Sequence, residues 1–140
     1  MRQILLFAAL AASLALLSGC ALSKAKEDKA EDMSDKAAYH KLSAEEAYEM
    51  MASQEVVVVD VRTREEYDGG HIENAVLVPN ESIGSETPEA LPDKEATLLI
   101  YCRSGRRSKD AAQKLLALGY QSVYDFGGVI DWPYELVKEG

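Results

Sequence analysis

The sequence predicts an α/β fold, in which an open sheet of mostly parallel strands carries helices on both faces. Short apolar runs at residues 56–59, 75–78 and 97–101 are typical of strands that are buried on both sides. Helical signals separate these runs, namely a capping box at Ser43 and an apolar stripe at helical spacing within residues 111–118. Strands that alternate with helices indicate parallel strands joined by helical crossovers.

The first predicted helix begins after Ser43, where Ser at the N-cap and Glu46 three residues later form the capping box. It carries Ala47, Met50 and Met51 on one side. The strand at residues 56–59 follows and is ended by a polar residue, and the strand at 75–78 stops at a proline.

In the loop before the next strand, Thr87-Pro88-Glu89 predicts the start of a one-turn helix. The strand at residues 97–101 then leads into the apolar helical stripe, which ends at Gly119, a typical residue just beyond a helix. We expect a further strand at residues 123–126 and a closing helix at residues 129–137, with Trp132 and Leu136 facing inward.

Composition limits the classes of function. The chain has 140 residues, enough for one modest core, and its formal charge of −9 lacks the basic face that nucleic-acid binding requires. Two cysteines do not make a disulfide framework, and His40 and His71 have no ligand-spaced partners. We therefore expect no nucleic-acid partner, no metal and no cofactor. We also expect the protein to be a monomer.

The N-terminus has the features of an export signal. One basic residue precedes an uncharged apolar run at residues 4–17, which ends in Ser18-Gly19-Cys20. As a helix this run would reach about 21 Å, less than the ~30 Å hydrocarbon core of a bilayer. An uncleaved anchor helix running on to residue 22 stays open as an alternative. The segment ending at Cys20 resembles the lipobox of bacterial lipoproteins, which implies a signal peptide at residues 1–19.

That resemblance implies lipid, palmitate included, on Cys20 and an exported chain anchored to a bacterial membrane, facing the periplasm or the cell exterior. Residues 20–38 mix lysines with acidic residues and have almost no large apolar side chain, so we expect a lipidated cysteine followed by a flexible charged tether. Residues 39–140 form the folded domain.

One cysteine stands where catalysis is expected. Cys102 follows a buried strand and precedes a helix, and the carboxyl ends of parallel strands are where active sites gather. Four basic residues follow within seven positions, and Gly105 permits a tight loop whose N–H groups converge. A buried structural cysteine is the alternative. The positive charge of this loop favours the thiolate, so we expect the pKa of the Cys102 thiol to be lowered. The same loop is expected to bind an oxyanion.

Several short motifs together resemble a single-domain rhodanese. They are Asp60-Val61-Arg62, Glu66-Tyr67, Gly70-His71-Ile72, Asn74-Ala75, Cys102-Arg103-Ser104-Gly105-Arg106-Arg107-Ser108, Gly127-Gly128 and Trp132. The resemblance covers residues 42–132 and implies a sheet of about five strands, including one near residues 39–42. It also implies a sulfurtransferase that moves a sulfane sulfur, from thiosulfate or a persulfide or polysulfide donor to a thiophilic acceptor, through a cysteine persulfide.

The position that matches the family's nucleophile is Cys102. The resemblance implies that the loop holds the persulfide and the anionic end of the donor; its residues are Arg103, Ser104, Gly105, Arg106, Arg107 and Ser108. We expect Asp60 and Arg62 to brace this loop by ion pairing and His71 to be structural. Gly127 and Gly128 are expected in a close-approach turn.

Two other functions stay open from the residues alone. One is a rhodanese-like binding module that has lost its chemistry. The other is a cysteine phosphatase or arsenate reductase. In those related folds an arginine follows the cysteine after five intervening residues, but here that position is Ser108 and the loop closes one residue earlier, at Arg107. A shorter loop makes a smaller pocket, which suits a sulfane sulfur better than a phosphate ester.

Overall fold

The computed structural model describes residues 38–139. The predicted signal peptide, Cys20 and the tether up to residue 37 lie outside these residues. The described part forms a five-stranded sheet in which every pair of neighbouring strands is parallel. The strands are β1 (Ala38–Lys41), β2 (Val57–Asp60), β3 (Val76–Leu77), β4 (Thr97–Cys102) and β5 (Ser122–Gly128). Their order is β1-β5-β4-β2-β3, so β4 is the central strand and the predicted α/β sheet is confirmed.

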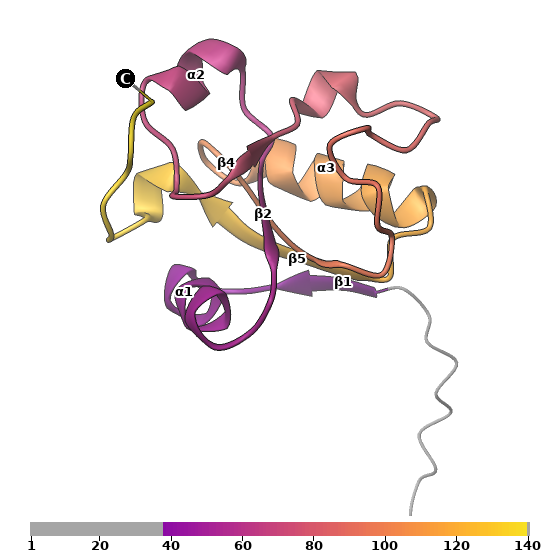
Figure 1. Ribbon diagram of the computed structural model, residues 1–140, viewed down its shortest axis with the longest axis horizontal. Coiled ribbons are helices and arrows are strands. Elements are labelled where there is room, and N and C mark those ends of the chain that lie inside the picture. The colour runs from indigo at the N-terminus through magenta and orange to yellow at the C-terminus, as the bar shows by residue number, and fades with distance from the viewer. Residues whose placement is uncertain (1–37, 140) are drawn as a thin grey trace, which may run out of the picture. The chain divides into compact units, whose positions relative to one another are not determined.

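Side chains of the central strand alternate between two apolar layers. Leu98, Ile100 and Cys102 pack on the side of α3 (Arg106–Ala117). Leu99 and Tyr101 pack on the other side, with Ala47 of α1 (Ala44–Ser53). Figure 1 shows these two helices on opposite sides of the strands. Because both faces are covered, the strands are apolar throughout and not alternating.

Two capping boxes fix the starts of helices. At α1, Ser43 accepts a hydrogen bond from the Glu46 N–H while the Glu46 carboxylate accepts one from the Ser43 N–H, as predicted. The same exchange joins Thr63 and Glu66 at α2 (Arg64–Asp68), a helix that was not predicted. The spacing of Thr63 and Glu66 would have identified it. The end of α3 is followed by Gly119, whose φ is +95°, as the sequence predicted.

The predicted closing helix is wrong. After β5 the chain makes only one 3-10 turn, η2 (Val129–Asp131). Proline lacks an N–H and disfavours helical backbone in the residue before it, and Trp132, which precedes Pro133, has an extended ψ of 113°. Trp132 does pack against the core beside Phe126, but Leu136 is 41% exposed and does not face inward.

The last described residues instead run back across the sheet end. Val137 and His71 exchange backbone hydrogen bonds of 2.8 and 2.9 Å in an isolated antiparallel bridge. The helix start predicted at Thr87-Pro88-Glu89 is also wrong, because that segment holds only a turn, with the Leu91 N–H donating to the Pro88 carbonyl. The 3-10 turn of this long loop lies earlier, at η1 (Asn80–Ser82).

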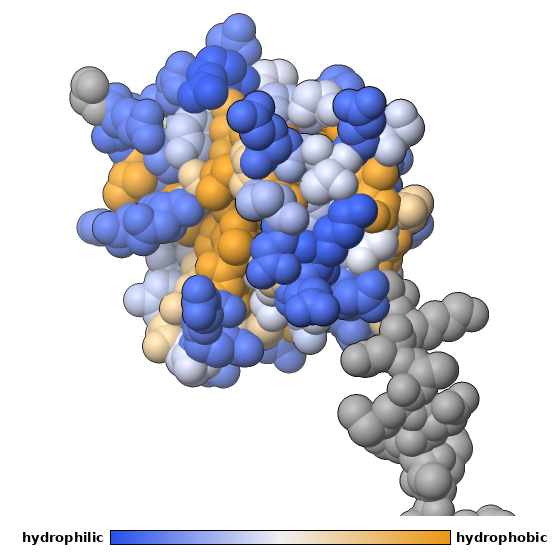
Figure 2. Space-filling model, turned by 45° about the vertical axis from the view of Figure 1, so that its right-hand side comes forward, coloured by the Kyte–Doolittle hydropathy of each residue, from blue (hydrophilic) through white to orange (hydrophobic). Residues whose placement is uncertain are grey.

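Figure 2 shows one face, on which a band of apolar residues runs between charged and polar ones. Within the described residues, no helix is both long and apolar enough to cross a membrane.

The end of β5 lies unusually close to the segment that follows β4. A Cβ atom added at Gly128 would lie 2.2 Å from the Arg103 carbonyl oxygen and 2.5 Å from the Ser104 Cα. The neighbouring Gly127 has a φ of +91°, which L side chains rarely adopt. The predicted close approach at these two glycines is therefore present, and only glycine fits at position 128.

We expect Gly128→Ala to lower the free energy of unfolding by about 1–3 kcal/mol, because the added methyl group must displace backbone atoms. The matched control is Gly84→Ala, where an added Cβ meets no atom within 4 Å, and this change should stay within about 0.5 kcal/mol of the wild type. Urea unfolding followed by circular dichroism measures both. Equal stabilities of the two variants would contradict the close approach.

Candidate active site

Cys102 is the last residue of β4, and its side chain is only 1% exposed. The chain then turns tightly, because Gly105 adopts a φ of +100° and starts α3 without any side-chain cap. The first N–H groups of a helix have no partner within the helix. The strand end and the helix start therefore place a sulfur atom beside unpaired backbone donors.

Hydrogen-bond donors around the sulfur favour its negative charge. The Gly105 N–H donates to Cys102 Sγ at 3.0 Å. Burial by itself raises the pKa of the Cys102 thiol, but donors from Ser108 and the N–H groups of Gly105 and Ser104 outweigh it, so the pKa lies below its usual range. A thiol with a lowered pKa at a helix N-terminus is equipped to act as a nucleophile.

The buried carboxylate of Asp125 stabilises this loop by hydrogen bonds. Asp125 of β5 is fully buried, and it accepts hydrogen bonds from the Ser108 hydroxyl at 2.7 Å and the Gly127 N–H at 2.9 Å. From β1, the Tyr39 hydroxyl and the Lys41 ammonium donate to its other oxygen. Burial and this carboxylate raise the pKa of Tyr39 to about 12, so the phenol stays a donor at neutral pH.

The loop arginines do not all point the same way. Arg107 forms a bidentate pair with Glu66 of α2, with two N–O distances of 2.8 Å. That guanidinium lowers the pKa of Glu66 to about 2, so the pair is charged over the whole neutral range. Arg103 and Arg106 are exposed, and neither forms an ion pair with another described residue.

Asp60 and Arg62 form a further ion pair, which is buried and lies at the end of β2. The Arg62 guanidinium donates to the Asp60 carboxylate at 2.6 Å and to the Gly70 carbonyl at 2.8 Å. The Tyr101 hydroxyl, one residue before Cys102, also donates to Asp60 and accepts from the Ile72 N–H. The predicted ion pair is present, and among the described residues it reaches the loop through β4 and not by a direct hydrogen bond to residues 103–108.

A shallow pocket of about 330 Å³ lies next to the loop. Two arginines and two glutamates supply its charged lining, namely Arg62, Arg103, Glu65 and Glu66. Val129, Ile130 and Leu136 line its apolar side, and Ile130 is 63% exposed. The pocket thus offers charged groups of both signs and an aliphatic wall beside the loop.

The structure places the predicted loop residues 102–108 in one tight turn, in which donors of Ser104, Gly105 and Ser108 surround Cys102 Sγ while Arg103 and Arg106 are exposed and Arg107 pairs with Glu66. It also adds residues to which the sequence analysis assigned no role there, namely Glu66, Tyr101 and Asp125. The signal for Asp125 was a lone charged residue within an otherwise apolar strand. His71 is buried, stacks on Tyr67 and contacts its carbonyl, as a structural residue would. No cluster of metal-ligating side chains is present within residues 38–139.

Comparisons with known proteins agree with this geometry. The model of the rhodanese-like domain family matches residues 43–133. An E. coli structure described as a rhodanese with anions is 33% identical, with a TM-score of 0.55, over 61% of this chain and 100% of that chain. A human single-domain sulfurtransferase is 26% identical, with a TM-score of 0.59, over 66% of this chain and 93% of that one.

Curated relatives include the tRNA uridine(34) hydroxylase of Yersinia pestis, which is 32% identical over 106 residues. The alignment covers 72% of this chain, but the chain spans only about 30% of the length of that relative. The shared part is therefore one domain of a longer protein. With the family match, the parallel sheet and the cysteine loop in agreement, the chain belongs to the rhodanese-like domain family.

Proposed function

We propose that this protein is a sulfurtransferase that carries a sulfane sulfur as a persulfide on Cys102. The observation that carries the proposal is the set of donors from Ser108, Gly105 and Ser104 that lowers the pKa of the buried thiol. The same donors are positioned for the terminal sulfur of a persulfide, which also bears a negative charge. The human relative described as a sulfurtransferase adds support.

The reaction has two displacement steps. With thiosulfate, the Cys102 thiolate attacks the sulfane sulfur, a new S–S bond forms on the cysteine, and sulfite leaves with the electron pair of the broken S–S bond. A thiophilic acceptor such as cyanide then attacks the outer sulfur, and the thiolate is regenerated as thiocyanate leaves. Loop N–H groups stabilise the sulfur anion before and after each step.

The natural donor is proposed more broadly as a small anion with a sulfane sulfur, either thiosulfate or a persulfide or polysulfide. The basic residues Arg103, Arg106 and Arg107 favour an anion in an otherwise acidic chain. The hydroxylase relatives are about three times longer than the shared segment, so the proposal takes from them the domain and not their reaction.

Thiosulfate should add one sulfur atom to the protein, and cyanide should remove it as thiocyanate. The Cys102→Ser variant should do neither while keeping its fold, because the hydroxyl has no accessible anion at neutral pH. Intact-mass spectrometry after incubation of the reduced protein checks the first part, and colorimetric thiocyanate detection checks the second.

Two results would contradict the proposal. A wild-type protein that gains no sulfur from thiosulfate, a persulfide or a polysulfide would be a binding module. Faster turnover of a phosphate ester than of thiosulfate would indicate a phosphatase.

We propose that Arg107 binds the anionic end of the donor, in exchange for its pairing with Glu66. Arg107→Ala should lower kcat/KM for thiosulfate by about tenfold or more, because a hydrogen bond to a charged group is lost. An uncharged sulfur donor should be affected less. Arg106→Ala is the matched control, since Arg106 lies on the same loop but is exposed and has no ion-pair partner in the described part of the chain. Equal effects of the two variants would show that only the net charge of the loop matters.

We further propose that the mature chain begins at Cys20, carries lipid there, and holds the rhodanese-like domain at a bacterial membrane, facing the periplasm or the cell exterior. The support is the short apolar run at residues 4–17 and the small residues before Cys20.

Cys20→Ala should move the protein from the detergent phase to the aqueous phase or block its processing, because the cysteine is the acceptor of the lipid. Phase partitioning and the mass of the N-terminal peptide measure this. A variant that retains residues 1–19 and partitions with membrane as the wild type does would indicate an anchor helix in place of the lipid.

A further inference from the structure

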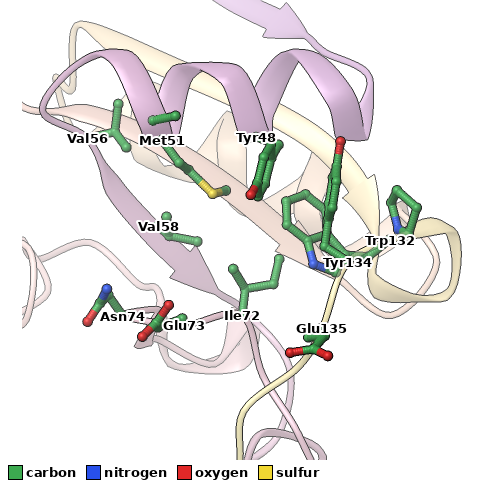
Figure 3. Close-up of a pocket in the computed structure, with 12 residues that line it drawn as sticks. Tyr48, Met51, Val56, Val58, Ile72, Glu73, Asn74, Trp132, Tyr134 and Glu135 are labelled. Atoms are coloured by element: carbon green, nitrogen blue, oxygen red, sulfur yellow. The ribbon is translucent and has the colours of Figure 1, made fainter.

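A second and larger cleft lies away from the cysteine loop. Its volume is about 820 Å³, and its lining shares no residue with the loop 102–108. Figure 3 shows side chains from α1, β2, the segment after His71 and the C-terminal segment around one hollow. The volume falls within the range of ~300–1,000 Å³ that is typical of small-molecule sites.

Aromatic rings form one wall of this cleft. The rings of Tyr48 and Tyr134 stack with centroids 3.9 Å apart, and the Trp132 ring meets that of Tyr134 nearly edge-on, at 5.0 Å and 69°. The stacking covers one face of each tyrosine ring, and the residues remain 46% (Tyr48) and 36% (Tyr134) exposed. The faces of such rings attract cations.

The charge of the lining has one sign. Glu73 and Glu135 contribute carboxylates, and none of the residues that line the cleft is a lysine, an arginine or a histidine. The cysteine loop has the opposite character, with three arginines. The cleft therefore disfavours the anions that the loop attracts, and it favours a cation.

One polar atom at the cleft has no partner. The indole Nε1 of Trp132 is buried and forms no hydrogen bond with any described residue. Figure 3 shows this nitrogen on the side of the ring that faces Ile72 and Glu135. A buried donor without a partner is unfavourable, and since its ring lines the cleft, this N–H is sensitive to what fills the cleft.

We propose that this cleft binds a small organic cation with an apolar, preferably aromatic, body. The body lies against Met51, Val58 and Ile72, and the cationic group lies near Glu73 and Glu135. The proposal is independent of the sulfur transfer at Cys102. A volume of about 820 Å³ falls within the small-molecule range, so we take a small molecule as the occupant in place of the lysine or arginine side chain of a polypeptide.

Three probes with the same phenol body test the selection by charge: tyramine, the neutral alcohol 4-hydroxyphenylethanol, and the anion 3-(4-hydroxyphenyl)propionate. The chain has one tryptophan, so the Trp132 indole N–H gives a single signal in the proton–nitrogen NMR spectrum of the full chain. We expect tyramine to shift this signal in a saturable way, because the Trp132 ring lines the cleft. The alcohol should bind on the order of fivefold more weakly, since two exposed ion pairs are lost, and the anion more weakly still.

The double variant Glu73→Gln/Glu135→Gln should weaken tyramine binding to the level of the alcohol, whereas the matched control Glu86→Gln/Glu89→Gln, which removes two exposed carboxylates outside the cleft, should leave it unchanged. Equal binding of tyramine and the alcohol, tighter binding of the anion, or the absence of a saturable indole shift would each overturn the proposal. A shift caused by a lysine-containing peptide but not by tyramine would overturn it in favour of a polypeptide partner.

Discussion

A negative charge on the buried sulfur of Cys102 is the constraint on which the rest of the site depends. The side chain is 1% exposed, and removal from water disfavours a thiolate. Only donors that point at the sulfur from the protein itself can offset that cost. The turn after β4 supplies them, since Gly105 takes a left-handed conformation that aims its own N–H at the sulfur and starts α3 beside it.

Two buried carboxylates keep that turn in place from opposite sides of the sheet. Asp125 ties the Ser108 hydroxyl of α3 to β5 and β1, and Asp60 ties Tyr101 to the end of β2. Between them, Gly128 lets β5 approach the loop backbone more closely than any side chain would allow. The reactive loop is therefore short and exposed at Arg103 and Arg106, yet it is held directly by Asp125 and, through Tyr101 of β4, indirectly by Asp60.

Local patterns in the sequence predicted most of the fold. Apolar runs marked β2, β3 and β4, and a capping box marked α1, because those signals need no distant contact. The prediction of a helix in the C-terminal segment was wrong. Its apolar spacing suggested a helix, but Pro133 and the distant bridge to His71 give it an extended conformation. Cys102 and its loop were predicted from their place between a strand and a helix, from the basic residues that follow, and from the resemblance to a rhodanese. The pairing of Arg107 with Glu66 was not predicted, because residues 41 positions apart meet only once the sheet is formed.

The most direct test of this account is the titration of Cys102, read as the ultraviolet thiolate absorbance of the wild type minus that of Cys102→Ser. The loop donors favour the charged form, so the midpoint should lie below the ordinary cysteine value of about 8.5, and the rate of persulfide formation should rise with the same midpoint. A midpoint at or above that value would mean that burial outweighs the loop donors, and would contradict the activation of Cys102 by its loop.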